Sequence, residues 1–157
     1  FIDGEHLALL QRGNTVSGRN ARVRVALAPL LAGIARGDAT VPLAYEDICD
    51  FLLGDINGIS LSFTDGAALP GGGFVFTAAA EDTDNSYADG TCAGSAIGII
   101  DANDQLQQVW QLDGTRKLEG IAALETAHGL ELLLVSDPDD ANVAGQLLTT
   151  IIPSWKR

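Results

Sequence analysis

One strand-and-turn pattern occurs twice in this chain, and it limits the possible folds more than any other feature. Ser62–Asp84 (SFTDGAALPGGGFVFTAAAEDTD) has a polar entry with an Asp-Gly pair, a glycine-rich turn, an apolar strand and an acidic end. Lys117–Asp140 (KLEGIAALETAHGLELLLVSDPDD) has the same outline, with Glu119-Gly120 in place of Asp65-Gly66. Repeats of this kind, built from short strands and turns, are typical of β-propeller blades.

Each repeat ends in an acidic residue at a matching position. Glu81 follows the apolar strand of the first repeat, and Asp137 follows that of the second. Leu7–Asn14 (LALLQRGN) resembles the second half of the same unit, with Arg12 and Asn14 where acids close the other two. Like residues at like positions are what radial symmetry produces, so the pattern favours an all-β propeller. A β-sandwich is the alternative.

The repeats divide the chain into three units. Residues 1–57 are expected to form a partial blade with a connection, 58–113 a full blade and 114–157 a second partial blade. Because about three blades leave apolar sheet faces uncovered, we expect part of a six-bladed ring. A missing N-terminal half or a second copy of the chain would close it. The chain starts at Phe1 and contains no methionine, so we expect the native N-terminus to lie upstream.

Local sequence patterns predict the secondary structure of three segments near the N-terminus. Asn20–Leu27 (NARVRVAL) alternates strictly, which predicts a half-buried edge strand with Arg22 and Arg24 on its outer face. Pro29–Tyr45 is broken up by proline and glycine and is expected to be a loop or short strand. Glu46–Leu53 (EDICDFLL) has apolar residues near helical spacing, which predicts a short helix or turn.

Composition excludes some partners. The 157 residues carry a formal net charge of −12, and no lysine or arginine occurs from Gly37 to Thr115. Nucleic acids and anionic membranes require basic surfaces, so neither is an expected partner. Cys49 and Cys92 show no metal-binding spacing and are expected to be free, buried thiols. The sequence leaves the location open between cytoplasm and periplasm.

Four carboxylates are candidate metal ligands: Asp65, Glu81, Glu119 and Asp137. If the first strand of each blade lines the central channel, Asp65 and Glu119 point toward one axial region. Converging carboxylate oxygens suit Ca²⁺ or Mg²⁺. The competing interpretation is that these acids cap backbone N–H groups in turns.

Three further residues are candidate ligand-binding groups. Arg12 and Asn14 close the first partial repeat and would be axial counter-charges to the acids. Lys117 precedes Glu119 and would pair with a carboxylate or bind a phosphate. An exposed lysine at the end of a strand is the alternative interpretation for Lys117.

The segments TDGAALPGGGFVFTAAAEDT, DGTCAGSAIGIID and KLEGIAAL…LLLVSDPDD carry a resemblance. Through them residues 1–153 resemble the C-terminal half of a family of uncharacterised bacterial β-propellers, distantly similar to phytase-like and gluconolactonase-like propellers. The resemblance implies a six-bladed ring. In gluconolactonase-like propellers a Glu-Gly pair supplies an axial calcium ligand, and Glu119-Gly120 is similar. Here Ile121 and Ala122 follow it, whereas those proteins have proline and an aromatic residue.

Three functions are compatible with these features. The first is a propeller that binds a ligand or a divalent metal such as Ca²⁺ at the ring axis. The second is a hydrolase of a phosphoester or lactone, in which a metal polarises the substrate and a carboxylate acts as base. The third is a protein-interaction scaffold. Whether the chain is an enzyme stays open at this point.

Overall fold

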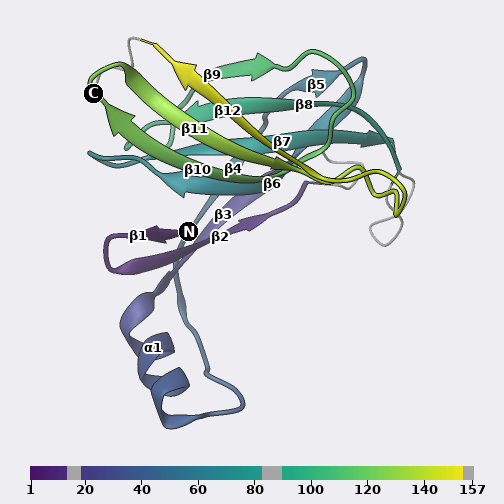
Figure 1. The fold of residues 1–157 in the computed structure, drawn as a ribbon. Coiled ribbons are helices and arrows are strands. Elements are labelled where there is room, and N and C mark those ends of the chain that lie inside the picture. Colours follow the sequence, from purple (N-terminus) through teal and green to yellow (C-terminus); the bar gives the residue numbers. More distant parts are fainter. Residues whose placement is uncertain (14–18, 83–89, 154–157) are drawn as a thin grey trace.

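The computed structural model describes residues 1–13, 19–82 and 90–153, which form three antiparallel sheets of consecutive strands (Figure 1). The first sheet contains β1 (Ile2–Asp3), β2 (His6–Gln11), β3 (Asn20–Ala26) and β4 (Tyr45–Phe51). The second contains β5 (Asp55–Ile56), β6 (Ile59–Ala68), β7 (Phe74–Asp82), β8 (Thr91–Ile100) and β9 (Leu106–Gln111). The third contains β10 (Leu118–Thr126), β11 (Gly129–Ser136) and β12 (Gln146–Ile152). The all-β prediction is confirmed, and the sheets are consistent with blades or with a sandwich-like arrangement.

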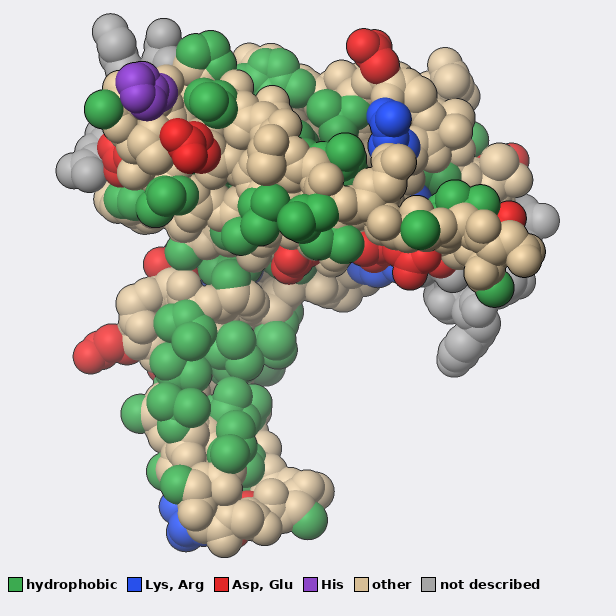
Figure 2. All heavy atoms as spheres, viewed as in Figure 1, with side chains coloured by type: hydrophobic (Ala, Val, Ile, Leu, Met, Phe, Trp, Pro, Cys, Tyr) green, Lys and Arg blue, Asp and Glu red, His purple; other side chains and the backbone are tan. Residues whose placement is uncertain are grey.

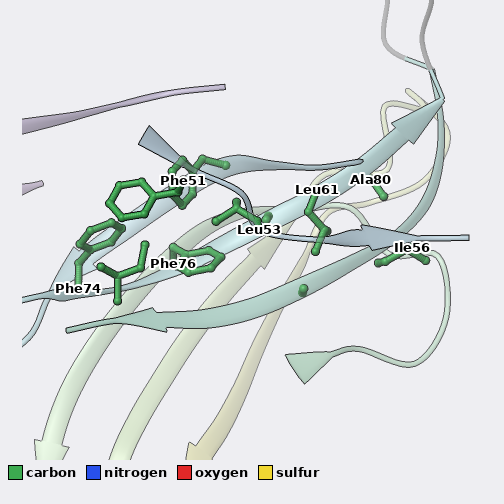
Figure 3. Close-up of a cluster of buried hydrophobic side chains, with 11 residues drawn as sticks. Phe51, Leu53, Ile56, Leu61, Phe74, Phe76 and Ala80 are labelled. Atoms are coloured by element: carbon green, nitrogen blue, oxygen red, sulfur yellow. The ribbon is translucent and has the colours of Figure 1, made fainter. Parts of the chain in front are cut away.

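The second sheet has both faces buried. One face packs toward the first sheet, around a cluster that includes Phe51, Leu61, Phe74 and Phe76 (Figure 3). The opposite face packs toward the third sheet through a cluster that includes Val75, Ile97, Leu118 and Leu132. Neighbouring residues of a strand point to opposite faces, so a strand buried on both sides must be apolar throughout. This explains the unbroken apolar run in β7, which the sequence identified as a strand.

The glycine-rich turn before β7 has a steric cause. Gly73 has a φ of 78°, and a Cβ atom there would lie 2.3 Å from the carbonyl oxygen of Ile100. Any other residue would therefore clash with the end of β8 as well as adopt a strained backbone. The turn brings β6 and β7 together, and Asp101 forms the next turn by accepting hydrogen bonds from the N–H groups of Asn103 and Gln105. β8 and β9 form an antiparallel hairpin around this turn.

The prediction that the arginine-rich strand lies at a sheet edge is wrong. β3 lies between β2 and β4, and Arg22 is only 1% exposed. Its guanidinium pairs with Asp47, 2.9 Å away in β4, and with Asp104 in the β8–β9 turn. Arg24 pairs with Asp3 and Asp47. Carboxylates from distant segments compensate these charges, which allows the strand to be central.

The structure of Glu46–Leu53 also differs from the prediction. Tyr45–Phe51 is a strand rather than a short helix or turn, because pairing with β3 supplies its backbone hydrogen bonds. In so short a segment, helical spacing and strand alternation are hard to distinguish. The two cysteines are free, as predicted, but both are half-buried rather than fully buried.

The segment after β3 forms a helix where a loop or short strand was predicted. α1 (Leu27–Arg36) ends at Gly37, which adopts a left-handed conformation. Pro29 lies in the first turn, where its missing N–H group is not needed. Gly33 does not break the helix because Val41 of the returning segment packs directly against it. α1 projects away from the sheets (Figure 1), and the described residues include no helix long and apolar enough to cross a membrane.

The polar entry of each repeat lies inside a strand. Both strands contain a β-bulge, in the middle of β6 and near the start of β10. The bulged residue is Thr64 in β6 and Glu119 in β10. In the pairing register Glu119 therefore corresponds to Thr64, one residue away from the Asp65 with which sequence comparison aligned it. A one-residue offset changes the face to which a side chain points, so Asp65 and Glu119 have different surroundings.

A buried asparagine joins the first sheet to the second. Asn20, at the start of β3, is 0% exposed. Its Oδ1 atom accepts hydrogen bonds from the backbone N–H groups of Gly13 (2.9 Å) and Phe63 (2.8 Å). Its Nδ2 atom donates to the carbonyl oxygen of Leu61 at 2.9 Å. The Asn20 side chain therefore supplies hydrogen bonds that join the backbones of the two sheets.

Candidate functional site

A buried lysine lies among three carboxylates near the start of the third sheet. Lys117 immediately precedes β10, and its side chain is 6% exposed. Its Nζ atom lies 2.6 Å from Asp139 Oδ2, 2.8 Å from Glu81 Oε1 and 3.3 Å from Glu119 Oε1. The prediction that Lys117 pairs with a carboxylate is thus what the geometry shows, and the exposed-lysine alternative does not apply.

The same cluster connects all three sheets. Glu81, near the end of β7, has a side chain that is 5% exposed and that also pairs with Arg12. Arg12 follows β2 of the first sheet, and Lys117 leads into β10 of the third. A carboxylate buried this deeply requires compensating charges, and here it receives one from each neighbouring sheet. Asn14, the other group expected near Arg12, lies outside the described residues.

The cluster shifts two pKa values. Burial by itself would lower the pKa of Lys117, but hydrogen bonds to Asp139 and Glu81 and the nearby negative charges outweigh burial and raise it. The lysine is therefore a permanent cation. Burial raises the pKa of Glu119, and the nearby positive charges of Lys117 and Arg12 only partly oppose that shift.

The two remaining predicted carboxylates have local structural roles. Asp65 Oδ2 accepts a hydrogen bond from the backbone N–H of Ile121 at 2.9 Å, which joins β6 to β10. Asp137 Oδ1 accepts one from the backbone N–H of Asp139 at 3.0 Å, and this turn holds Asp139 beside Lys117. Capping of backbone N–H groups, the competing interpretation of these acids, describes both contacts.

The cluster as it stands does not fit a divalent cation. The Nζ atom of Lys117 lies within 3.3 Å of one oxygen from each of Glu81, Glu119 and Asp139. That is where a metal sharing these oxygens would have to be. Among the described residues, no group of three or more His, Cys, Asp or Glu side chains has the arrangement of a metal site. The lysine ammonium supplies the positive charge that converging carboxylates need.

A polar pocket of about 800 Å³ opens beside Lys117. The start of β8, the β9–β10 connection and the β11–β12 connection form its walls. Its polar lining includes Thr91, Thr115, Arg116, Lys117, Ser136, Asp139 and Gln146. Sequence reasoning selected only Lys117 from this set. One signal for Arg116 was present, since Arg116 and Lys117 are the first basic residues after a long segment that contains only acidic charges.

The pKa shift of Glu119 predicts a pH-dependent effect of the Glu119→Gln substitution. A carboxyl group whose pKa is raised on folding stabilises the folded state when protonated, and this stability is lost as pH rises through the folded-state pKa. Glutamine cannot ionise, so Glu119→Gln should be more stable than the parent at pH 7 and should lose that advantage at pH 4. Urea unfolding at both values measures it. Glu5→Gln, at an exposed position, is the control, and an equal change at both pH values contradicts the prediction.

Comparison with known proteins places the chain in one group. A family model described as "Family of unknown function (DUF6910)" matches residues 1–141. No curated protein and no solved structure matches the chain. The matched region contains the Lys117 cluster and most of the pocket lining, but it ends before β12 and Gln146.

Proposed function

The chain belongs to the family of unknown function DUF6910, and from its own geometry we propose that it binds a small polar ligand in the pocket beside Lys117. The observation that carries this proposal is a permanent buried ammonium group in the wall of an open polar pocket. Its volume lies in the range typical of small-molecule sites.

The pocket is held in place before any ligand arrives. Lys117 is fixed by three carboxylates. Arg116 donates from Nε to Gln146 Oε1 at 3.0 Å, and the backbone N–H of Gln146 donates to Ser136 Oγ at 3.2 Å. Groups that are ordered in advance lose little conformational entropy on binding, which favours recognition of a specific ligand. The lining contains both hydrogen-bond donors and acceptors, which suits a ligand that carries hydroxyl groups.

We also propose that the three sheets are blades of a propeller. The sheets are made of consecutive strands and stack face to face, and β6 packs beside both β10 and β2. This is the arrangement in which the first strands of blades surround an axis. The similarity to phytase-like and gluconolactonase-like propellers belongs to this proposal, and with it the interpretation of the Lys117 cluster as an axial site.

Blocking the pocket tests the binding proposal. Ala144 is an exposed residue of the pocket wall, so Ala144→Trp should fill the pocket without disturbing the core. We expect it to weaken binding of pocket ligands at least ten-fold. Binding is followed by NMR titration of the ¹⁵N-labelled chain. Ala39→Trp, an exposed site in the segment after α1, is the matched control. Ligands that bind both variants equally well do not occupy this pocket.

Calcium binding and hydrolysis stay predictions. A thermal melt with EDTA and with excess Ca²⁺ tests the first, because a cation bound only by the folded state raises the melting temperature. Calcium would have to displace the ammonium group of Lys117 from Glu81 and Glu119. Turnover of phosphoesters or lactones that disappears in Glu119→Gln would support the second. The described lining of the pocket includes Lys117 but not Glu119, which gives the binding function precedence.

An interaction role is supported by a separate observation. The outer face of the third sheet exposes Leu124, Leu133, Val135, Leu147 and Ile151. Figure 2 shows further hydrophobic side chains along the projecting α1 segment, where Leu31 and Ile34 are more than half exposed. We propose that a second copy of the chain covers the outer face, since this would continue the stack of sheets already formed within one chain. A stable monomer of 16.3 kDa in light scattering would contradict this.

A further inference from the structure

Arg116 differs from the other basic residues that the structure describes. Each of the others lies within 4 Å of a carboxylate, in the pairs Arg12–Glu81, Arg19–Asp50, Arg22–Asp47, Arg24–Asp3, Arg36–Asp38 and Lys117–Glu81. Arg116 has no carboxylate within that distance among the described residues, and its hydrogen bond goes to the neutral amide of Gln146. In a chain with a net charge of −12, an arginine without an acidic partner is unusual.

Of the described basic residues, the one without an acidic partner, Arg116, lies in the candidate pocket. Arg116 lines the same pocket as Lys117, with Asp139 as the acidic residue of the lining. Glu81, Glu119 and Asp139 already compensate the charge of Lys117, so Arg116 supplies the lining's positive charge that has no acidic partner among the described residues. Arg116 is exposed, so a ligand in the pocket can reach its guanidinium group.

The hydrogen bond to Gln146 also orients the guanidinium. It uses the Nε atom, and no described residue accepts a hydrogen bond from the two terminal nitrogens. A guanidinium group presents its donors in a planar fork that matches two oxygens of a carboxylate or a phosphate. A neutral partner such as glutamine holds the fork in position without cancelling its charge.

We propose that the pocket selects ligands that carry an oxyanion group, and that Arg116 binds that group. This inference rests on the proposed binding function and adds the chemical class of the ligand. The ligand is a small molecule with hydroxyl groups and one carboxylate or phosphate. The oxyanion pairs with Arg116, and the hydroxyl groups contact the polar lining around Ser136 and Asp139. Lys117, already held by three carboxylates, contributes a fixed positive charge and not the main contact.

The test uses three probes that share a sugar ring: glucuronate, glucose 6-phosphate and neutral glucose. Each is titrated by NMR into the full chain and into the variants Arg116→Gln, Arg116→Lys and Arg36→Gln. At least one anionic probe is expected to bind ten-fold or more tightly than glucose. Arg116→Gln should remove that preference, whereas Arg36→Gln, which lies in the projecting α1, should keep it. Arg116→Lys should spare phosphate more than carboxylate, because lysine binds phosphate as a point charge.

The outcomes separate this inference from the proposal on which it rests. If glucose binds in the pocket as tightly as the anions, or if Arg116→Gln leaves the preference unchanged, the oxyanion inference is wrong while the binding function stands. If none of the three probes shifts pocket resonances, both are wrong for ligands of this class. If binding persists in Ala144→Trp, the anion binds elsewhere and the inference is also wrong.

Discussion

Lys117→Met is expected to lower the free energy of unfolding by about 3 kcal/mol, since removing one partner of a buried ion pair leaves the other charge uncompensated. Glu81, whose side chain is 5% exposed, would keep Arg12 as its one charged partner among the described residues. We expect an effect near the lower end of the range for buried pairs, because Glu119 and Asp139 are about one-third exposed and can turn toward water. Urea unfolding followed by circular dichroism gives the free energy directly.

Two further variants show whether the loss arises from the uncompensated carboxylate. The double variant Lys117→Met with Glu81→Gln removes both charges and should recover at least half of the lost stability. Arg36→Met removes the cation of an exposed ion pair, in which Arg36 Nη2 lies 2.8 Å from Asp38 Oδ2. This substitution should change the free energy of unfolding by less than about 0.5 kcal/mol. A double variant as unstable as the single one would mean that Lys117 acts through its packing, and not through its charge.

Asn20→Ala is expected to have an effect of similar size, about 3 kcal/mol. The change leaves the N–H groups of Gly13 and Phe63 and the carbonyl of Leu61 without their present partner in a site with no solvent exposure. Each unsatisfied buried polar group costs roughly 1–3 kcal/mol, partly offset where neighbouring groups rearrange. Because these bonds join the first sheet to the second, the loss should also appear as faster hydrogen exchange at the start of β3 and in β6.

The control for this prediction is Asn142→Ala. The Asn142 side chain contacts Asp140 in an exposed turn, so its removal should have little effect on stability. Equal destabilisation by the two substitutions would contradict the role assigned to Asn20. A loss of stability in Asn20→Ala without faster exchange in β6 would show that the hydrogen bonds do not hold the sheets together.

Both predictions bear on function, because the two residues position the walls of the candidate site. Asn20 contacts Gly13, the neighbour of Arg12, and Arg12 holds Glu81 from the first sheet. Lys117 holds Glu81 from the third. A ligand that binds beside Lys117 should therefore stabilise the contact between sheets, and it should raise the free energy of unfolding in proportion to the logarithm of its concentration above the dissociation constant.

The sequence predicted those features that depend on neighbours along the chain. Strand alternation and turn chemistry identified β2, β7 and β11, since both signals lie within a few residues. Comparison of the two repeats singled out Glu81 and Glu119, and Lys117 was a candidate because it precedes Glu119. The structure brings all three together around the ammonium group of Lys117. The register of the repeats was predicted only to within one residue, because β-bulges leave no clear local signal.

The tertiary structure alone decided which charges are buried and what surrounds them. The alternating pattern around Arg22 is also typical of an edge strand. Ion pairs with Asp47 and Asp104 compensate the buried charge of Arg22 and so allow its strand to lie in the centre of the sheet. Lys117 is buried because Glu81 reaches it from β7, and Arg116 stands out because no carboxylate does so among the described residues. Burying a charge depends on partners that are distant in sequence, and their distances are set by packing of the sheets rather than by local propensity.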